Sequence, residues 1–370
     1  MSEGKMLAAQ CLSHPDLLDM VLSHVFSIEF EDCRLRWKDL QLIGSVSRAF
    51  VKPARKACLQ RIYVSSLPSL KALCYRVLPL FGAVHVKYLS FNLVREAFRG
   101  RDRRGVLFQD LAPLLSQCTM LRYLHADPCW HVQELDHFPL EAFEAMRNLS
   151  HLSHLVLCDP CCLDFLQALP KSAVMSIPAP LKYLHLDVIP PDGNPDQYVL
   201  ELMEAMARLP TACPTLQSLA IQANGSIMRP LIQLLSGFLS VAPSGFEKLT
   251  LATEDYAEQP YSLHFTSSSL HVARTVSFRY INSAKAFLQS PDANIFDACE
   301  VIPLTVQECD AYLNLLTSAW RHDMRAFTLY SDFAFNEFQL AKAEQAADLR
   351  GMTLVHDDPG VHLQELYWEY

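Results

Sequence analysis

Glycine is scarce in this sequence, with 11 residues among 370. Neither GxxxxGKS/T nor GxGxxG occurs, so the glycine-rich loops that bind phosphates in nucleotide-binding folds are missing. Net positive charge is missing as well, because the formal net charge is −9. A nucleic-acid-binding protein needs a basic face, so this balance disfavours that class, and we expect no nucleic-acid partner.

Long hydrophobic runs are also absent. The longest apolar stretch, residues 226–243, is interrupted by Arg229 and Pro230, so we expect no membrane span. Residues 1–5 are polar and no secretory hydrophobic segment follows them. We therefore expect a cytoplasmic and/or nuclear protein, and the 12 cysteines are predicted to be reduced, buried thiols.

Apolar residues are abundant, at 51% of the chain. A single core usually stops growing near ~250–300 residues, so 370 residues indicate two domains or a repeat array. The charge is unevenly distributed. Residues 1–110 carry 17 Lys and Arg against 10 Asp and Glu, and residues 111–370 carry 14 against 30, giving +7 and −16.

A six-residue pattern recurs along the chain, with apolar residues at its first, fourth and sixth places. Six clear copies begin at Val86, Leu121, Leu152, Leu181, Leu216 and Phe246, and two weaker copies begin at Ala273 and Met324. The alternation predicts strands with one buried face, and the segments between them, such as 162–169 and 198–209, have helical periodicity. We expect the fourth-place residues of neighbouring copies, such as Leu249 and Val276, to occupy the same position on adjacent strands.

A strand-plus-helix unit of this size buries its apolar face only by stacking on its neighbours. We therefore predict an α/β leucine-rich-repeat-like solenoid over residues 63–370, with a parallel sheet on one face and helices on the other. The alternative is a doubly wound parallel sheet, whose strands are covered on both faces. Such strands read as continuous apolar runs, whereas these carry polar residues at alternate places.

Residues 12–62 have a different pattern, after a short tail at 1–11. Three short helices are predicted there, over residues 15–26, 38–46 and 50–59. A domain of this size is marginally stable alone, so it packs on the first repeat or binds a partner.

The sequence at the first and third of these helices resembles an F-box. The match comprises Pro-Asp-Leu-Leu at 15–18, Val21-Leu22, Ser-Val-Ser-Arg-Ala-Phe at 45–50 and Pro53-Ala54. The continuation through Leu59–Val64 is similar to fungal F-box proteins that run directly into leucine-rich repeats. The resemblance implies a small three-helix head that binds a Skp-type adaptor through Pro15, Leu17, Leu18, Val21, Leu22, Val46, Arg48 and Phe50.

An F-box of this kind implies a function for the whole chain. It links the protein through the adaptor to a cullin–RING ubiquitin ligase, while the repeat array binds a protein substrate. Such a substrate receptor is not an enzyme and needs no cofactor. The alternative is a repeat scaffold with no ubiquitin link, in which the three helices pack shut as a cap of the array.

Two predicted strands carry the same triplet at the places that alternate with the leucines. The candidate substrate-binding residues are Tyr123, His125 and Asp127, then His154 from the strand between, and Tyr183, His185 and Asp187. Strands lie ~4.8 Å apart, so we expect one exposed surface rich in tyrosine and histidine. Tyrosine is a frequent hot-spot residue in protein interfaces. The alternative is a solvated sheet face with no partner.

Cysteine chemistry is the remaining possibility at this surface. Cys158 near histidines resembles a nucleophile with its base, but nothing supplies an oxyanion hole. Cys158 and Cys161 have C-x-x-C spacing, which suits a redox site or, with His151 and His154, a metal site. The second ligand pair of a zinc site is missing. We therefore expect buried structural cysteines, no catalytic residue and no metal.

A basic run of five arginines lies between residues 95 and 104. It suits a solvated loop or a contact with phosphate or an acidic partner.

Overall fold

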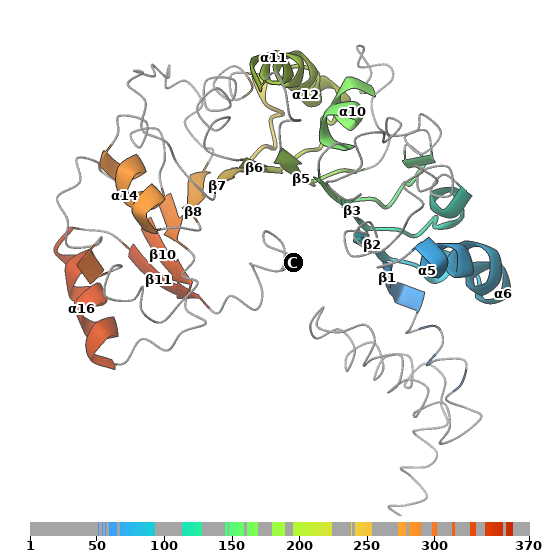
Figure 1. Cartoon of the computed structure of the whole chain (residues 1–370), viewed down its shortest axis with the longest axis horizontal. Coiled ribbons are helices and arrows are strands. Elements are labelled where there is room, and N and C mark those ends of the chain that lie inside the picture. Colours follow the sequence, from blue (N-terminus) through green and yellow to red (C-terminus); the bar gives the residue numbers. More distant parts are fainter. Residues whose placement is uncertain are drawn as a thin grey trace, which may run out of the picture. The chain divides into compact units, whose positions relative to one another are not determined.

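The computed structural model divides into two compact units, unit 1 (Met1–His154) and unit 2 (Leu155–Tyr370), and each is described by itself. The structure describes residues 51, 54, 56, 59–64, 67–92, 113–127, 145–146, 148–158, 161–168, 180–188, 195–223, 238, 241–253, 273–278, 281–289, 298–301, 313–314, 326–330, 337–350 and 353–357. Figure 1 shows the course of the chain and the labels used below.

Unit 1 contains a parallel sheet whose strands are paired in chain order. Its strands are β1 (Arg61–Val64), β2 (Tyr88–Asn92) and β3 (Tyr123–Asp127). A continuous helical segment joins β1 to β2: α5 (Leu67–Ala72), the π-helical turn η1 (Leu73–Val77), and α6 (Leu78–Phe81). Gly82 ends it with φ of 86°, a conformation that costs glycine little, and the 3-10 turn η2 (Ala83–His85) follows.

The core of unit 1 lies between this sheet and the helical segment. Leu89 of β2 pairs in register with Leu124 of β3, and both are buried. Leu70 and Leu78 of the helical segment are also buried. The apolar places of the six-residue pattern thus face the helices, as alternation along a strand requires.

Strand β4 (His154–Cys158) begins at the last residue of unit 1 and continues into unit 2.

The described part of unit 2 contains seven further strands, again parallel and paired in chain order. They are β5 (Tyr183–Val188), β6 (Ser218–Ala223), β7 (Lys248–Thr253), β8 (Ala273–Phe278), β9 (Ala298–Val301), β10 (Ala326–Tyr330) and β11 (Thr353–Asp357). Its helices are α10 (Cys161–Ala168), α11 (Pro195–Met206), α12 (Leu209–Ala212), α14 (Ile281–Gln289) and α16 (Glu337–Asp348).

A ladder of leucines forms the core of unit 2. Leu184, Leu219 and Leu249 occupy one register position on β5, β6 and β7, and all three are buried. Helices α10, α11 and α12 lie on the same side of β5 and β6 (Figure 1). They contribute Phe165 and Leu202 to this core, because the apolar residues of each helix recur on one face.

The α/β architecture with a parallel sheet is present as predicted. The predicted helix at 162–169 corresponds to α10, and the one at 198–209 corresponds to α11 with the start of α12. Three strands were not predicted: β1, β9 and β11. They are four or five residues long.

The predicted equivalence of Leu249 and Val276 is wrong. Val276 pairs with Leu251, so the copy on β8 is shifted by two residues relative to β7. A shift of two residues leaves every side chain on the same face, and Val276 is buried.

Candidate protein-binding surface

The residues that alternate with the core positions lie on the opposite face of each sheet, called here the front face. In unit 1 its first row is Arg61, Tyr88 and Tyr123, which the strand pairing aligns on β1, β2 and β3. Its second row is Tyr63, Ser90 and His125. The front face of unit 1 therefore places aromatic and basic residues in register along consecutive strands.

The first row of unit 1 is joined by contacts between neighbouring side chains. The guanidinium carbon of Arg61 lies 4.8 Å from the ring centroid of Tyr88, a cation–π contact. The Tyr88 and Tyr123 ring centroids are 6.1 Å apart, and those of Tyr123 and His154 are 6.3 Å apart. Tilted pairs at these distances attract one another, so the row forms a continuous ladder of rings.

Hydrogen bonds hold two front-face histidines of unit 1, His125 and His154, in place. Ser90 Oγ and His125 Nδ1 are 2.8 Å apart in a buried hydrogen bond between β2 and β3. Ser153 Oγ lies 2.9 Å from His154 Nδ1 and donates to the carbonyl of Arg122 at 3.2 Å. Both imidazole rings are therefore oriented by a neighbouring serine.

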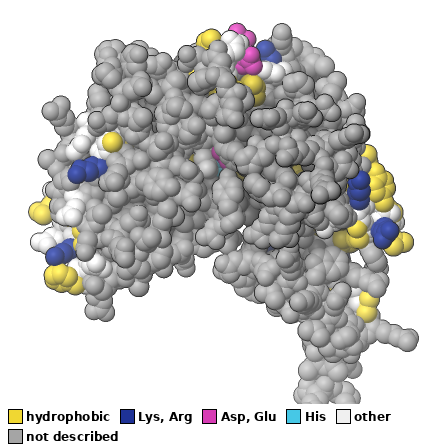
Figure 2. Space-filling view, viewed as in Figure 1, with side chains coloured by type: hydrophobic (Ala, Val, Ile, Leu, Met, Phe, Trp, Pro, Cys, Tyr) yellow, Lys and Arg dark blue, Asp and Glu magenta, His cyan; other side chains and the backbone are white. Residues whose placement is uncertain are grey.

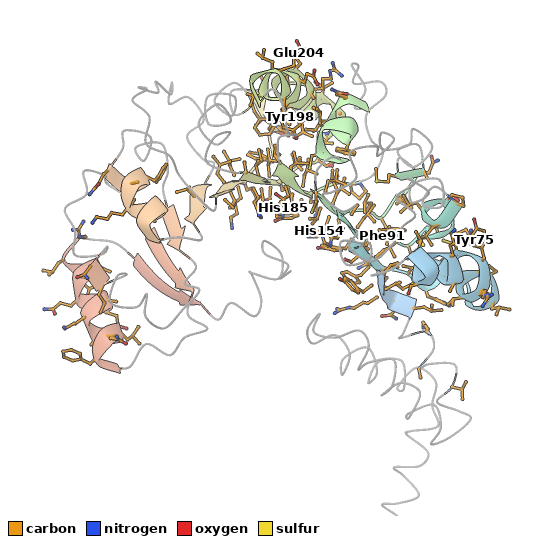
Figure 3. The ribbon with its side chains drawn as sticks, in the orientation of Figure 1. Tyr75, Phe91, His154, His185, Tyr198 and Glu204 are labelled. Atoms are coloured by element: carbon orange, nitrogen blue, oxygen red, sulfur yellow. The ribbon has the colours of Figure 1, made fainter. Side chains whose placement is uncertain are left out.

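The front face of unit 2 begins with Tyr183, His185 and Asp187 on β5. His185 and Tyr198 lie on opposite sides of the sheet, with Tyr198 on the helix side (Figure 3). The register aligns Tyr183 with Ser218 and His185 with Ala220. On β7 the corresponding residues are Lys248 and Thr250. Tyr183 is therefore followed by a serine and a lysine on β6 and β7, and His185 by an alanine and a threonine.

The predicted substrate-binding residues lie at the alternating strand positions, as expected. Tyr123, His125 and His154 belong to unit 1, where Tyr123 contacts His154, and Asp127 is described only by its pairing with Asn92. Tyr183, His185 and Asp187 belong to unit 2. A single surface joining both triplets stays a prediction, because each unit is described by itself.

The expected exposure is wrong for four of these side chains. The exposed fractions are 8% for Tyr123, 2% for His125, 4% for His185 and 6% for Asp187. Large side chains on strands ~4.8 Å apart pack against one another and cover each other. His154 and Tyr183 are half-buried, and so are Arg61 and Tyr88, which leaves part of each accessible.

Sequence reasoning missed Arg61, Tyr63, Tyr88 and Ser90 as members of this surface. Leu59-Gln-Arg-Ile-Tyr-Val64 has apolar residues at the first, fourth and sixth places, so the same pattern that revealed β2 also fits β1. Tyr88 occupies in its own copy the place that Tyr123 occupies in the next. Extending the pattern by one copy would have found the start of the row.

The cysteines whose side chains the structure describes are buried thiols that are not joined in disulfides: Cys74, Cys118, Cys158, Cys162 and Cys213. Burial raises the pKa of the Cys118 thiol to about 12, with a further rise from neighbouring Cys74. Burial also raises the pKa of Cys213 to about 12. The Cys162 thiol donates to the carbonyls of Leu157 (2.9 Å) and Asp187 (3.3 Å).

These observations agree with structural roles for the described thiols. Thiols with a pKa near 12 are protonated, and hence poor nucleophiles, at neutral pH. The Cys161 side chain lies outside the described residues. Within the part of the chain that is described, no group of three or more His, Cys, Asp or Glu side chains is arranged to hold a metal ion.

The predicted adaptor-binding residues, Pro15 to Phe50, lie outside the described residues, as does the arginine run at 95–104. Among the described helices, none has the length and apolar character needed to cross a membrane. A scan of protein-family models and a search of curated proteins find no match to this chain.

Proposed function

We propose that this chain is a non-catalytic substrate receptor of a Skp–cullin–F-box ubiquitin ligase. In this proposal the head at residues 12–62 binds a Skp-type adaptor and the repeat array binds a protein substrate. The observation that carries it is the F-box-like match at residues 15–54, placed directly before strands that repeat one pattern. The receptor brings two proteins together and uses no cofactor.

Support for a solenoid comes from the strand order within each unit. Within unit 1 the strands β1 to β3, and within unit 2 the strands β5 to β11, pair with their chain neighbours and run parallel, so each of these strands lies beside the one before it. A doubly wound sheet reverses its strand order at a switch point, and the described strands of neither unit do so. Repeats that contact only their neighbours give this order and leave an extended front face.

Support for substrate binding at the front face comes from its chemistry. Tyrosine and arginine are enriched in the centres of protein interfaces. Tyr88 and Arg61 are half-buried and held by contacts to neighbouring rings, so little side-chain freedom remains to be lost on binding. The front face of unit 1 is therefore the proposed substrate contact.

The adaptor arm of the proposal is tested by capture of a purified Skp-type adaptor on the full-length chain. Wild type should retain the adaptor, and Leu18→Ala and Phe50→Ala should lose most of it. Leu349→Ala is the matched control, because Leu349 is 82% exposed and outside the head. Absence of adaptor binding by wild type, or equal binding by all variants, would contradict the proposal.

The substrate arm is tested by cross-linking and co-purification from cells with the double variant Tyr88→Ala/Tyr123→Ala. A protein captured by wild type should be lost from this variant and retained by Lys248→Ala, a front-face control in unit 2. If the double variant still binds the adaptor and captures the same proteins as wild type, the adaptor link is retained and the proposed substrate surface is wrong.

A further inference from the structure

The outer side of the helical segment α5–η1–α6 in unit 1 carries exposed apolar residues beside basic ones. Tyr75 is 65% exposed and Leu80 is 76% exposed. Lys71 and Arg76 of the same segment are also exposed. These four residues are called the basic patch. Figure 2 shows hydrophobic and basic side chains gathered at the edge where Figure 1 places α5 and α6.

The π-helical turn produces this arrangement. Leu73 and Cys74 enter the turn buried, and the next two residues, Tyr75 and Arg76, are both exposed. An aromatic ring and a cation are thus consecutive exposed residues within the wider turn. Turns of this type are rare in helices and are frequently found at functional positions.

The sequence around the basic patch has no compensating negative charge. Residues 40–95 contain no Asp or Glu, whereas they contain nine Lys and Arg. A surface with exposed apolar groups and one sign of charge suits a partner with apolar groups and the opposite charge.

Unit 2 carries a surface of that complementary kind on α11. Leu200 is 54% exposed, and Glu204, one turn further on, is exposed. Glu201 is half-buried and accepts from the amides of Gln197 (2.9 Å) and Gln167 (3.4 Å). Leu200, Glu201 and Glu204 are called the acidic patch. Acidic side chains are visible over α11 (Figure 2), and Glu204 points away from the strands (Figure 3).

The acidic patch holds two carboxylates beside one cation, Arg208, which lies one turn after Glu204 and donates to the Gln167 carbonyl (3.1 Å). The described hydrogen bonds of Glu201 come from neutral amides, which orient the carboxylate without neutralising it. Tyr198 and Leu202 face the core, so α11 is anchored on one side and presents Leu200 on the other.

We propose that the basic patch of one copy of this chain binds the acidic patch of a second copy. Tyr75 and Leu80 would cover Leu200, while Lys71 and Arg76 face Glu201 and Glu204. The contact is heterologous, so each assembled pair keeps one unused patch of each kind and can add further copies. Both patches lie on helices, so the front face of neither unit is part of the contact. This inference does not depend on the proposed receptor function.

The test is sedimentation velocity of the full-length chain over a concentration series. At low salt, wild type should show a mass that rises with concentration, and the rise should shrink at high salt, because screening weakens exposed charge pairs. Lys71→Glu/Arg76→Glu and Glu201→Lys/Glu204→Lys should each self-associate at least about tenfold more weakly than wild type. Lys285→Glu/Lys342→Glu, a double reversal on α14 and α16, is the matched control and should behave as wild type.

Mixing the two patch variants gives the decisive result. Each retains the patch that the other lacks, and the two reversed patches also complement each other, so an equimolar mixture should regain the concentration-dependent assembly that neither variant shows alone. The chain carrying all four substitutions should self-associate again, because its basic patch has become acidic and its acidic patch has become basic. Leu200→Ser, which changes no charge, should also weaken association. Circular dichroism establishes that each variant is folded. A monomeric wild type at every concentration, or variants that assemble like wild type, would overturn the proposal.

Discussion

The two units share one kind of core and differ on their front faces. In unit 1, Leu89 and Leu124 align on neighbouring strands, and in unit 2, Leu184 and Leu219 do the same. The first front-face row, however, joins Arg61, Tyr88 and Tyr123 in unit 1 and passes from Tyr183 to Ser218 and Lys248 in unit 2. One face of the pattern is constrained by burial, whereas the other is free to differ from copy to copy.

This difference indicates where function resides. Equivalent cores make equivalent contributions to folding, so they do not distinguish the units. The ladder of rings is found in the described rows of unit 1, which is why substrate binding is proposed there. Comparing the cores of the two units, and then their front faces, tests this difference.

The largest expected effect is protection of the buried thiols in both units. Because burial raises the pKa of Cys118 and Cys213 from 9.0 to about 12, the thiolate fraction of each at pH 8 should fall about a thousandfold. Both cysteines should resist alkylation in the folded chain and react quickly in denaturant. Mass spectrometry of the modified peptides measures both rates. Rapid reaction of one cysteine in the folded chain would show that its unit has an open core.

The same thiols give a dependence of stability on pH. Above pH 9 the unfolded thiols lose protons that the folded thiols retain, so the free energy of unfolding falls as pH rises. Their contribution is complete below pH 9 and is lost between pH 9 and about 12. Denaturation series from pH 8 to about pH 11 should show a smaller loss in Cys118→Ala and Cys213→Ala than in wild type.

The next effect is truncation of the core leucines. Leu124→Ala in unit 1 and Leu219→Ala in unit 2 should each cost about 2–5 kcal/mol of unfolding free energy, because each leaves a cavity in a buried ladder. Chemical denaturation monitored by circular dichroism measures both. The control Leu349→Ala, at an exposed position, should change stability by less than about 0.5 kcal/mol. A loss of unfolding free energy in only one of the two leucine variants would show that the cores are not equivalent.

A smaller effect distinguishes a second-row serine of unit 1, Ser90, from a first-row serine of unit 2, Ser218. Ser90→Ala removes the buried hydrogen bond to His125 and should cost about 1–3 kcal/mol. Ser218→Ala, on the half-buried front of β6, should cost less than about 0.5 kcal/mol. The same denaturation measurement compares them. Equal costs would mean that the Ser90–His125 pair contributes no more than an ordinary surface serine.

The smallest effect is the coupling between rings of the first row. A double-mutant cycle of Tyr88→Ala and Tyr123→Ala should give an interaction energy of about 0.5–1.5 kcal/mol. The corresponding cycle of Ser218→Ala and Lys248→Ala in unit 2 should give a value near zero, because neither residue has a ring. Equal interaction energies in the two cycles would contradict the attraction between the rings of Tyr88 and Tyr123.

Much of the sheet was predictable because burial on one face constrains residue type. The leucines at 89, 124, 184 and 219 are buried on strands that the six-residue pattern predicted. The two-residue shift at Val276 was not predictable, because such a shift preserves the face of every residue and leaves no mark on the pattern.

The candidate surface was predictable only in part. Alternation places His125 and His185 on the front face, but it does not reveal how much of each side chain the neighbouring strands cover. Arg61 was missed because residues 59–64 were assigned to the F-box-like head and its continuation, although they fit the six-residue pattern. Its contact with Tyr88 depends on pairing between strands, which sequence alone does not give.

Calorimetric titration of the full-length chain with a purified Skp-type adaptor tests the receptor proposal most directly. The proposal predicts one adaptor bound per chain, loss of the binding heat in Leu18→Ala and Phe50→Ala, and unchanged binding in Tyr88→Ala/Tyr123→Ala. Absence of binding by wild type, or loss of binding on changing the tyrosines while the head substitutions have no effect, would contradict it.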